Sequence, residues 1–239
     1  MIFFETSMRK KFPTRVLLLL LLLSLSSCAS TGQTTDPLEP FNRKVQTFND
    51  TVDTYAIKPV AQGYAYVVPE FIRIGLRNAF DNLGYISVFI NQFLQGKGEA
   101  GFIDMYRFIF NSTLGIAGLF DVATELGMPA NDEDFGQTFA VWGFGSGPYL
   151  VLPFLGPATV RDGVSYVPEY FVSPVTYIDD DAVRWSVFGA ALIVERERLL
   201  EKEKLIVGDR YLFIRDAYLQ RRQYLINDGQ EVEDPFLTD

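Results

Sequence analysis

The stretch DPLEPFNRKVQTFNDTVDTY, residues 36–55, decides the fold class. Asp36, Pro37 and Glu39 predict a helix start, with the aspartate at the N-cap, the proline in the first turn and the glutamate closing a capping box. Apolar residues then recur at spacings of three and four, at Phe41, Val45, Phe48, Val52 and Tyr55. They fall on one stripe of an amphipathic helix, which Lys58-Pro59 is expected to interrupt.

Helical patterns continue along most of the chain. A second short helix is expected up to about residue 68, and an amphipathic helix over residues 69–94 ends at the glycines of segment 95–98. Residues 102–114 are apolar nearly all round, which is typical of a central helix or of one that faces lipid. Two more helices are predicted over residues 182–205 and 211–226. Strand patterns are nearly absent, so residues 36–226 predict one all-α domain.

One segment interrupts this helical pattern. It holds Gly143, Gly145, Gly147, Pro148 and Tyr149. Ser146 lacks the flanking glycines of a nucleophile elbow, and Pro148 stands where a dinucleotide motif needs its third glycine. The segment therefore predicts a tight turn or a small glycine-rich hairpin, in which glycines adopt unusual dihedral angles.

The residues ahead of this domain resemble a bacterial lipoprotein signal. Basic residues precede an apolar run over residues 16–23, and small residues then lead to Cys28. This pattern predicts a signal peptide over residues 1–27, a lipobox that acylates Cys28, and a tether over residues 28–35. An ordinary signal peptide with a chance cysteine is the alternative. Ala29, in place of an aspartate that would retain the protein at the inner membrane, favours the periplasmic face of an outer membrane.

The composition excludes several kinds of activity. The chain has no histidine, and Cys28 is its only cysteine, so serine–histidine and cysteine–histidine catalysis cannot be built. Asp132-Glu133-Asp134 is interpreted as a helix cap because a cation site needs more oxygen ligands. A Ser–Lys dyad or a carboxylate pair remains formally possible, but no spacing points to one, so we expect no catalytic residues, no metal and no cofactor.

Charge and hydropathy restrict the partners. Without residues 1–27, which hold four of the 21 basic and one of the 30 acidic residues, the net charge is −12. Such a chain has no electrostatic footprint for nucleic acid. Aromatic residues make up 15%, yet no apolar run after Cys28 approaches the ~18 residues of a membrane span. Amphipathic elements that bury apolar surface against lipid and a well-packed soluble domain both remain open.

Several stretches, taken in order, resemble the MlaA (VacJ) family of outer-membrane lipoproteins. They cover nearly all of residues 36–226, and only their combination is specific. The stretches are Asp36-Pro-Leu-Glu-Pro-Phe-Asn-Arg43, Asn91-Gln-Phe-Leu-Gln-Gly96, Arg107-Phe-Ile-Phe-Asn-Ser-Thr-Leu-Gly115, Asp121-Val-Ala123, Phe135-Gly-Gln137, residues 143–155, and Arg215-Asp-Ala-Tyr-Leu-Gln-Arg221.

The resemblance implies a ring-like bundle of amphipathic helices lying in the inner, periplasmic leaflet of the outer membrane of a Gram-negative bacterium. An amphipathic channel would remove mislocalised phospholipids from the outer leaflet and pass them to a soluble, MlaC-like periplasmic shuttle, which maintains lipid asymmetry. Trimeric porins are implied as further partners. A lipoprotein that organises porins without transporting lipid is the alternative.

The resemblance also implies roles for particular residues. The glycine-rich hairpin at Gly143, Gly145, Gly147, Pro148 and Tyr149 would shape or gate the channel, a plain structural turn being the alternative. Arginines matched by family motifs would meet phosphate head groups or form internal ion pairs, and pairing is favoured. These arginines are Arg43, Arg107, Arg215 and Arg221.

Two charged segments lie outside these assignments. The Glu/Arg/Lys face at residues 195–204 is either a partner surface or simply solvated. The acidic segment over residues 227–239 predicts a disordered tail.

Overall fold

The structure, a computed structural model, describes residues 36–230. The predicted signal peptide, Cys28 and the tether lie outside the described residues, as does the predicted tail from residue 231 onward. Residues 227–230, the beginning of that tail, follow the last helix as a turn. The described residues belong to one compact unit.

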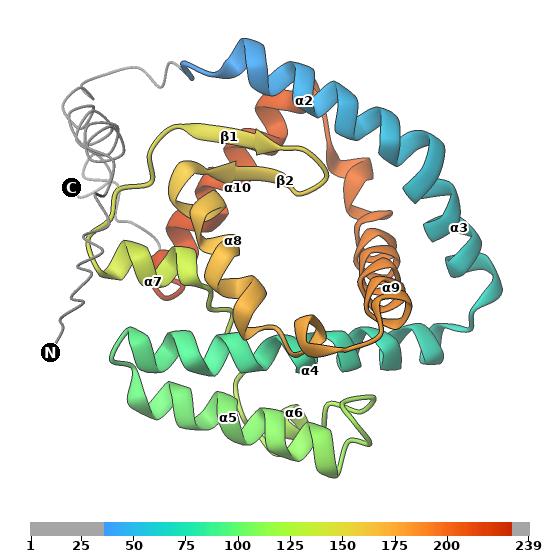
Figure 1. Ribbon diagram of the computed structural model, residues 1–239, viewed down its shortest axis with the longest axis vertical. Helices are drawn as coiled ribbons and strands as arrows, with labels where there is room; N and C mark the ends of the chain where they lie inside the picture. Colours follow the sequence, from blue (N-terminus) through green and yellow to red (C-terminus); the bar gives the residue numbers. More distant parts are fainter. Residues whose placement is uncertain (1–35, 231–239) are drawn as a thin grey trace, which may run out of the picture. The chain divides into compact units, whose positions relative to one another are not determined.

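Helices make up most of this unit, as the sequence predicts (Figure 1). Short irregular turns accompany them: the π turn η1 (Asp53–Ile57) and the 3₁₀ turns η2 (Pro174–Tyr177) and η3 (Lys202–Leu205). The helices and strands are α2 (Glu39–Val52), α3 (Lys58–Val67), α4 (Glu70–Leu94), α5 (Gly98–Thr113), α6 (Val122–Glu125), α7 (Phe135–Val141), β1 (Tyr149–Leu152), β2 (Gly156–Thr159), α8 (Val160–Val172), α9 (Asp181–Leu199) and α10 (Arg210–Ile226).

The first helix differs from the prediction at both ends. It begins at Glu39, because the Asp36 carboxylate accepts a hydrogen bond from the Leu38 N–H at 3.0 Å in a turn ahead of the helix. Nor does Lys58-Pro59 break it: η1 joins α2 directly to α3, with the Lys58 N–H donating to the Asp53 carbonyl. The proline thus falls in the first turn of α3, and the π turn ahead of it accommodates the missing N–H without a break in the helix.

Contacts between the elements close a ring. The helix α2 packs on β1, β2 contacts α10, α10 contacts α7, and α7 contacts α4. The circuit then returns through α9 and α3 to α2, while α5 covers α4 and α8 contacts both strands, α7 and α4. Figure 1 shows α2 and α3 following one another along one side, with α4 and α5 along another. The predicted ring-like all-α bundle is confirmed.

A small hairpin lies within this ring. Strands β1 and β2 pair antiparallel, with Tyr149 opposite Thr159 and Leu152 opposite Gly156. The turn of the hairpin is therefore residues 153–155. The glycine-rich segment 143–148 is instead the connection from α7 into β1, which corrects its predicted place. An apolar tip, Phe154 and Leu155, occupies the turn itself.

Two asparagines of α2 hold the free edge of β1. The Asn42 side chain donates to the Tyr149 carbonyl at 3.0 Å and accepts from the Val151 N–H at 2.9 Å. Asn49 likewise donates to the Leu152 carbonyl and accepts from the Phe154 N–H, both at 2.9 Å. Asn42 and Asn49 are two helical turns apart, so they face the same way. They satisfy backbone groups that a third strand would otherwise satisfy.

The face of α2 that lies inward is therefore polar. Asn42 and Gln46 are buried, whereas Phe41, Phe48 and Tyr55 of the predicted stripe are 54%, 45% and 82% exposed. The sequence locates the apolar stripe correctly, but its three aromatic members are largely exposed, and Val45 alone packs against the core cluster around Tyr149 and Tyr211.

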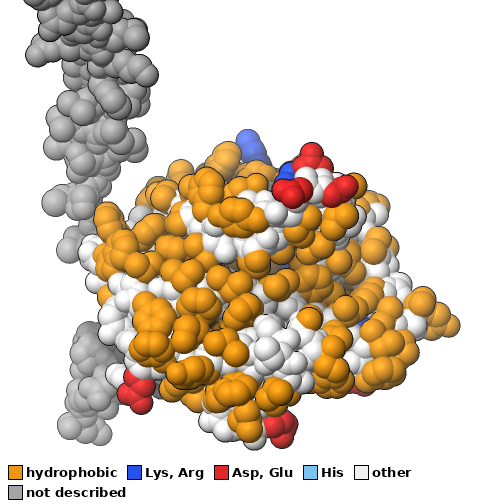
Figure 2. Space-filling view, turned by 60° about the horizontal axis from the view of Figure 1, so that its bottom comes forward, with side chains coloured by type: hydrophobic (Ala, Val, Ile, Leu, Met, Phe, Trp, Pro, Cys, Tyr) orange, Lys and Arg blue, Asp and Glu red, His pale blue; other side chains and the backbone are white. Residues whose placement is uncertain are grey.

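The same inversion holds for α5. Its inward positions are Gly101, Asp104, Arg107 and Asn111, all buried. Phe102, Tyr106 and Ile109 face outward and are about half exposed. Figure 2 shows one face of the molecule, largely covered by hydrophobic side chains. Between residues 36 and 230, no helix is both long enough and apolar enough to cross a bilayer.

Candidate functional site: a polar cavity beside an apolar cavity

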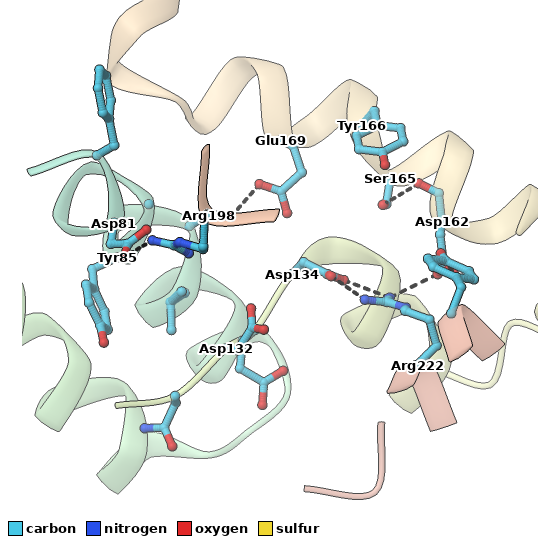
Figure 3. Close-up of a pocket in the computed structure, with 17 residues that line it drawn as sticks. Asp81, Tyr85, Asp132, Asp134, Asp162, Ser165, Tyr166, Glu169, Arg198 and Arg222 are labelled. Carbon is cyan, nitrogen blue, oxygen red and sulfur yellow. Dashed lines mark hydrogen bonds and ion pairs between the residues drawn. The ribbon is translucent and has the colours of Figure 1, made fainter. Parts of the chain in front are cut away.

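A polar cavity of about 680 Å³ lies where α4, α8, α9 and α10 meet the segment ahead of α7 (Figure 3). Its walls carry acidic, basic and tyrosine side chains. They are formed by Phe80, Asp81, Gly84, Tyr85, Ser87, Val88, Asn131, Asp132, Glu133, Asp134, Asp162, Ser165, Tyr166, Glu169, Arg198, Tyr218 and Arg222.

Arg222 organises one end of this cavity. Its guanidinium lies 3.0 Å from a carboxylate oxygen of Asp162 and 3.0 Å from one of Asp134. The Tyr218 hydroxyl donates to the other Asp162 oxygen at 2.6 Å. Burial alone would raise the pKa of Asp162, but the hydroxyl and the guanidinium outweigh it and lower that pKa.

Local sequence explains why these carboxylates stand here. Asp134 is the N-cap of α7 and accepts from the Gln137 N–H at 2.8 Å, so the predicted cap at residues 132–134 is confirmed. Asp162 lies in the first turn of α8, whose N-cap is Thr159. Arg222 thus joins the starts of two helices, where negative charge is favourable. Within residues 36–230, no group of three or more acidic, histidine or cysteine side chains is arranged to bind a metal ion.

Glu169 and Arg198 stand elsewhere on the wall. The Glu169 carboxylate accepts from the Ser87 hydroxyl at 2.6 Å and from the Phe135 N–H at 3.0 Å. Burial raises the pKa of Glu169, although these two hydrogen bonds oppose the change. Arg198 pairs with Asp81 at 2.6 Å. Figure 3 shows Glu169 and Arg198 projecting into the cavity from α8 and α9.

An apolar cavity of about 530 Å³ adjoins the polar one. The two share the wall residues Phe80, Gly84, Ser87, Tyr166 and Glu169. Beyond them the second cavity is lined mainly by apolar side chains: Leu83, Leu155, Tyr170, Val172, Val175, Val187, Phe188 and Ala191. Polar and apolar space therefore meet at a common wall, and Leu155 of the hairpin tip reaches that apolar space. Such a pair of compartments suits an amphiphile.

The family model of the MlaA lipoprotein matches residues 34–225. The chain belongs to the MlaA family. It is 34% identical over 218 residues to the "Intermembrane phospholipid transport system lipoprotein MlaA" of Escherichia coli (strain K12), covering 86% of each chain. It is 30% identical to the protein of the same name in Haemophilus influenzae, over 93% of this chain and 94% of the relative.

Solved structures support the same membership. A chain from work on the "Structural basis for maintenance of bacterial outer membrane lipid asymmetry" superimposes with a TM-score of 0.69 at 34% identity. The match covers 81% of this chain and all of that one.

Among sequence relatives, an uncharacterised protein of Rickettsia conorii is 33% identical to this chain. The match covers 79% of this chain and 76% of the relative.

In this MlaA-family chain the glycine-rich segment lies next to the polar cavity. Gly143, Gly145 and Phe144 line a separate cavity of about 430 Å³ whose wall also includes Arg222. Gly143 and Gly147 have φ of +90° and +67°, a region that disfavours side chains. A Cβ on Gly147 would lie 3.0 Å from that of Val160.

The end of the segment anchors the hairpin. Pro148 accepts a backbone hydrogen bond from Val160 at 3.1 Å. Tyr149 is buried, with its ring edge-on to Tyr211 at 6.0 Å between centroids. Burial raises the pKa of Tyr149 well above its usual range.

Two of the four predicted arginines lie on α2 and α5. Arg107 is 1% exposed; it contacts Asp121 at 3.0 Å, donates to the Met128 carbonyl, and lies over the Tyr85 ring. Arg43 contacts Glu39 at 2.7 Å and Asp209 at 2.9 Å. The hydrogen bonds that Arg43 donates to Asp209 and Glu39 raise the pKa of Arg43.

The other two arginines lie on α10. Arg215 pairs with its neighbour Asp216 at 2.9 Å, and Arg221 pairs with Asp132 at 2.9 Å near the surface. All four arginines therefore pair with carboxylates of this chain, two of them near the surface, and none lines the polar or the apolar cavity. The charged face of α9 is also used internally, because Arg196 contacts Asp53 at 2.7 Å and Glu197 contacts Arg77 at 3.0 Å.

Sequence reasoning missed the residues that do line the polar cavity, above all Arg222 and Glu169. Tyr211, Tyr218 and Arg222 are spaced by seven and four residues, which places them on one face of α10. That spacing marks Arg222 as the inward member of the Arg221-Arg222 pair. Glu169 gives no comparable signal, because its donors come from α4 and from the start of α7.

Proposed function

We propose that this chain is an outer-membrane lipoprotein that removes mislocalised phospholipids from the outer leaflet and passes them to a soluble periplasmic shuttle. The observation that carries the proposal is the shared wall between the polar and the apolar cavity, inside a ring of helices whose outer side chains are apolar. Membership of the MlaA family supports it, since named relatives belong to an intermembrane phospholipid transport system.

The energetic task defines what such a protein must do. Exposing both acyl chains of a phospholipid to water costs on the order of 20 kcal/mol, at ~0.8 kcal/mol per CH₂. A passage that is apolar on one side and polar on the other lowers this barrier without any energy source. The direction of transfer is then set by the acceptor. In this proposal the acceptor is an MlaC-like shuttle, and trimeric porins hold the protein in place.

Two attachments to the membrane are part of the proposal. Acylated Cys28 anchors the protein from the periplasmic side, and the exposed apolar side chains of α5 and α8 contact lipid. Phe102, Ile109, Val164, Val167 and Phe171 supply such side chains, each more than 40% exposed. An exported Cys28→Ala variant tests the first attachment: mass spectrometry should show loss of the acyl groups. An unchanged mass would contradict lipidation at Cys28.

The glycine-rich segment, residues 143–149, is proposed to shape the passage by fixing the hairpin whose tip lines the apolar cavity. Freezing this segment with Gly145→Pro should let phospholipid accumulate in the outer leaflet. Acylation of lipid A reports that accumulation. Unchanged lipid asymmetry would instead indicate that the segment is only a structural turn.

For the four predicted arginines we propose the ion-pairing role, because each guanidinium group already contacts a carboxylate.

A transfer assay tests the function directly. Purified protein in vesicles that contain fluorescent phospholipid should deliver it to a soluble lipid-binding acceptor. Ala191→Trp fills the apolar cavity and should abolish delivery, whereas Val183→Trp, on the exposed start of the same helix, should not. Normal transfer by Ala191→Trp would reject the passage. No transfer by the wild type, with altered porin organisation in a deletion strain, would favour the scaffold function.

A further inference from the structure

The polar cavity holds more negative than positive charge. Six carboxylates line it: Asp81, Asp132, Glu133, Asp134, Asp162 and Glu169. Only two cationic side chains, Arg198 and Arg222, share that wall. A phosphate-binding cavity would be expected to show the opposite balance.

The two guanidinium groups are already engaged. Arg222 is held between Asp134 and Asp162, and Arg198 pairs with Asp81. Two other wall carboxylates have cations outside the cavity: Glu133 pairs with Lys97 and Asp132 with Arg221. An entering anion would therefore find no unpaired cation on this wall.

Glu169 differs from the other five carboxylates. Across residues 36–230 it forms no ion pair, and its hydrogen bonds come from a hydroxyl and a backbone N–H. A carboxylate offers about four acceptor sites, so two remain for a further donor. The rings of Tyr166 and Tyr218 on the same wall also attract cations, whereas the Tyr85 ring already faces Arg107.

The position of Glu169 fits the head group of a bound lipid. It lines both the polar and the apolar cavity, at the boundary where the head group of an amphiphile would lie when its tails occupy the apolar side. We propose that this boundary selects phospholipids that carry a primary ammonium on the head group, with Glu169 as the residue that contacts the ammonium. The proposal rests on the proposed function and names its preferred substrate class.

Competition between two lipids of equal chain length tests the selectivity. The full-length protein in detergent is given equimolar dioleoyl phosphatidylethanolamine and dioleoyl phosphatidylglycerol, and bound lipid is counted by native mass spectrometry. A hydrogen bond between charged groups should favour the ethanolamine lipid about tenfold. Glu169→Gln should bring the ratio close to one, whereas Glu201→Gln, an exposed carboxylate paired with Lys204, should leave it unchanged.

A second probe needs no variant. N-acetylation of phosphatidylethanolamine removes the ammonium but keeps the phosphate and both chains, so the tenfold preference should disappear. Equal binding of the three lipids by the wild type, or an unchanged ratio in a folded Glu169→Gln, would overturn the proposal. Because binding is measured without an acceptor, such a result is distinct from failure of the transfer assay.

Discussion

The ion pairs of Arg222 provide the sharpest test of the polar interior. Arg222→Met removes the charge but keeps a long apolar stem. It leaves Asp134 without its cation, while Asp162 keeps only Arg161 at 3.2 Å. The side chains of Arg222 and Asp162 are 10% and 6% exposed, so the pair is buried. Breaking a buried pair costs about 3–5 kcal/mol. Asp134 is 35% exposed and regains water, so the lower value of about 3 kcal/mol is expected.

The adjacent residue supplies a matched control. Arg221 and Asp132 are 67% and 59% exposed, and an exposed pair contributes about 0–1 kcal/mol. Thermal unfolding followed by circular dichroism, in one detergent for all variants, should show a Tm about 6–12 °C lower for Arg222→Met and nearly unchanged for Arg221→Met. Equal effects at the two positions would refute the assignment of a buried polar interior.

The Tm difference between wild type and Arg222→Met should change with pH in a defined direction. The folded state lowers the pKa of Asp162, so the stability contributed by its ionised form is present above its unfolded pKa of about 3.9. That stability is lost as the pH falls through the folded pKa. In Arg222→Met the pKa of Asp162 rises, and its protonation relieves the negative charge that Arg222 no longer balances. The Tm difference between wild type and variant should therefore narrow as the pH approaches 4.

Three further predictions address other parts of the structure. Gly147→Ala, at φ of +67° and against Val160, should lower stability by about 1–3 kcal/mol in denaturant titration, while Gly145→Ala, with open space around it, should change stability by less than about 0.5 kcal/mol. Folding raises the pKa of Glu169, so ionisation of its carboxyl group lowers the stability of the folded state as the pH rises through that pKa. The Glu169→Gln variant should therefore have a Tm at pH 7 at least as high as that of wild type, and its Tm should vary less with pH above about 4.3. A lower Tm at pH 7 would contradict this prediction. Phe102→Asp combined with Ile109→Asp, on the outward face of α5, should reduce sedimentation of unlipidated protein with vesicles about tenfold, and Glu99→Asp on the same helix should not; equal sedimentation would exclude this face from lipid contact.

The helices were predictable because their signals are local. Apolar spacing, the capping carboxylate of Asp134 and the glycine after α4 depend only on residues within a few turns. Errors arose where a local signal has two structural outcomes. Lys58-Pro59 marks a helix break by sequence, yet a π turn ahead of it lets the helix continue. The glycine-rich segment marks a turn, yet the hairpin turn lies ten residues after Gly143, beginning at Pro153.

The sequence by itself determined the all-α class, the amphipathic stripes and the family. The tertiary structure decided which side of each stripe lies inside. Periodicity separates the polar from the apolar face of a helix but does not tell which face lies inside the protein. Either face can be buried favourably when its surroundings match it. Here Asn42 bonds to β1 and both Arg107 and Asn111 bond to Asp121, so these polar residues are buried and the aromatic side chains are exposed. The meeting of Arg222 with Asp134 and Asp162, and of Glu169 with Ser87, likewise depends on helices far apart in the chain.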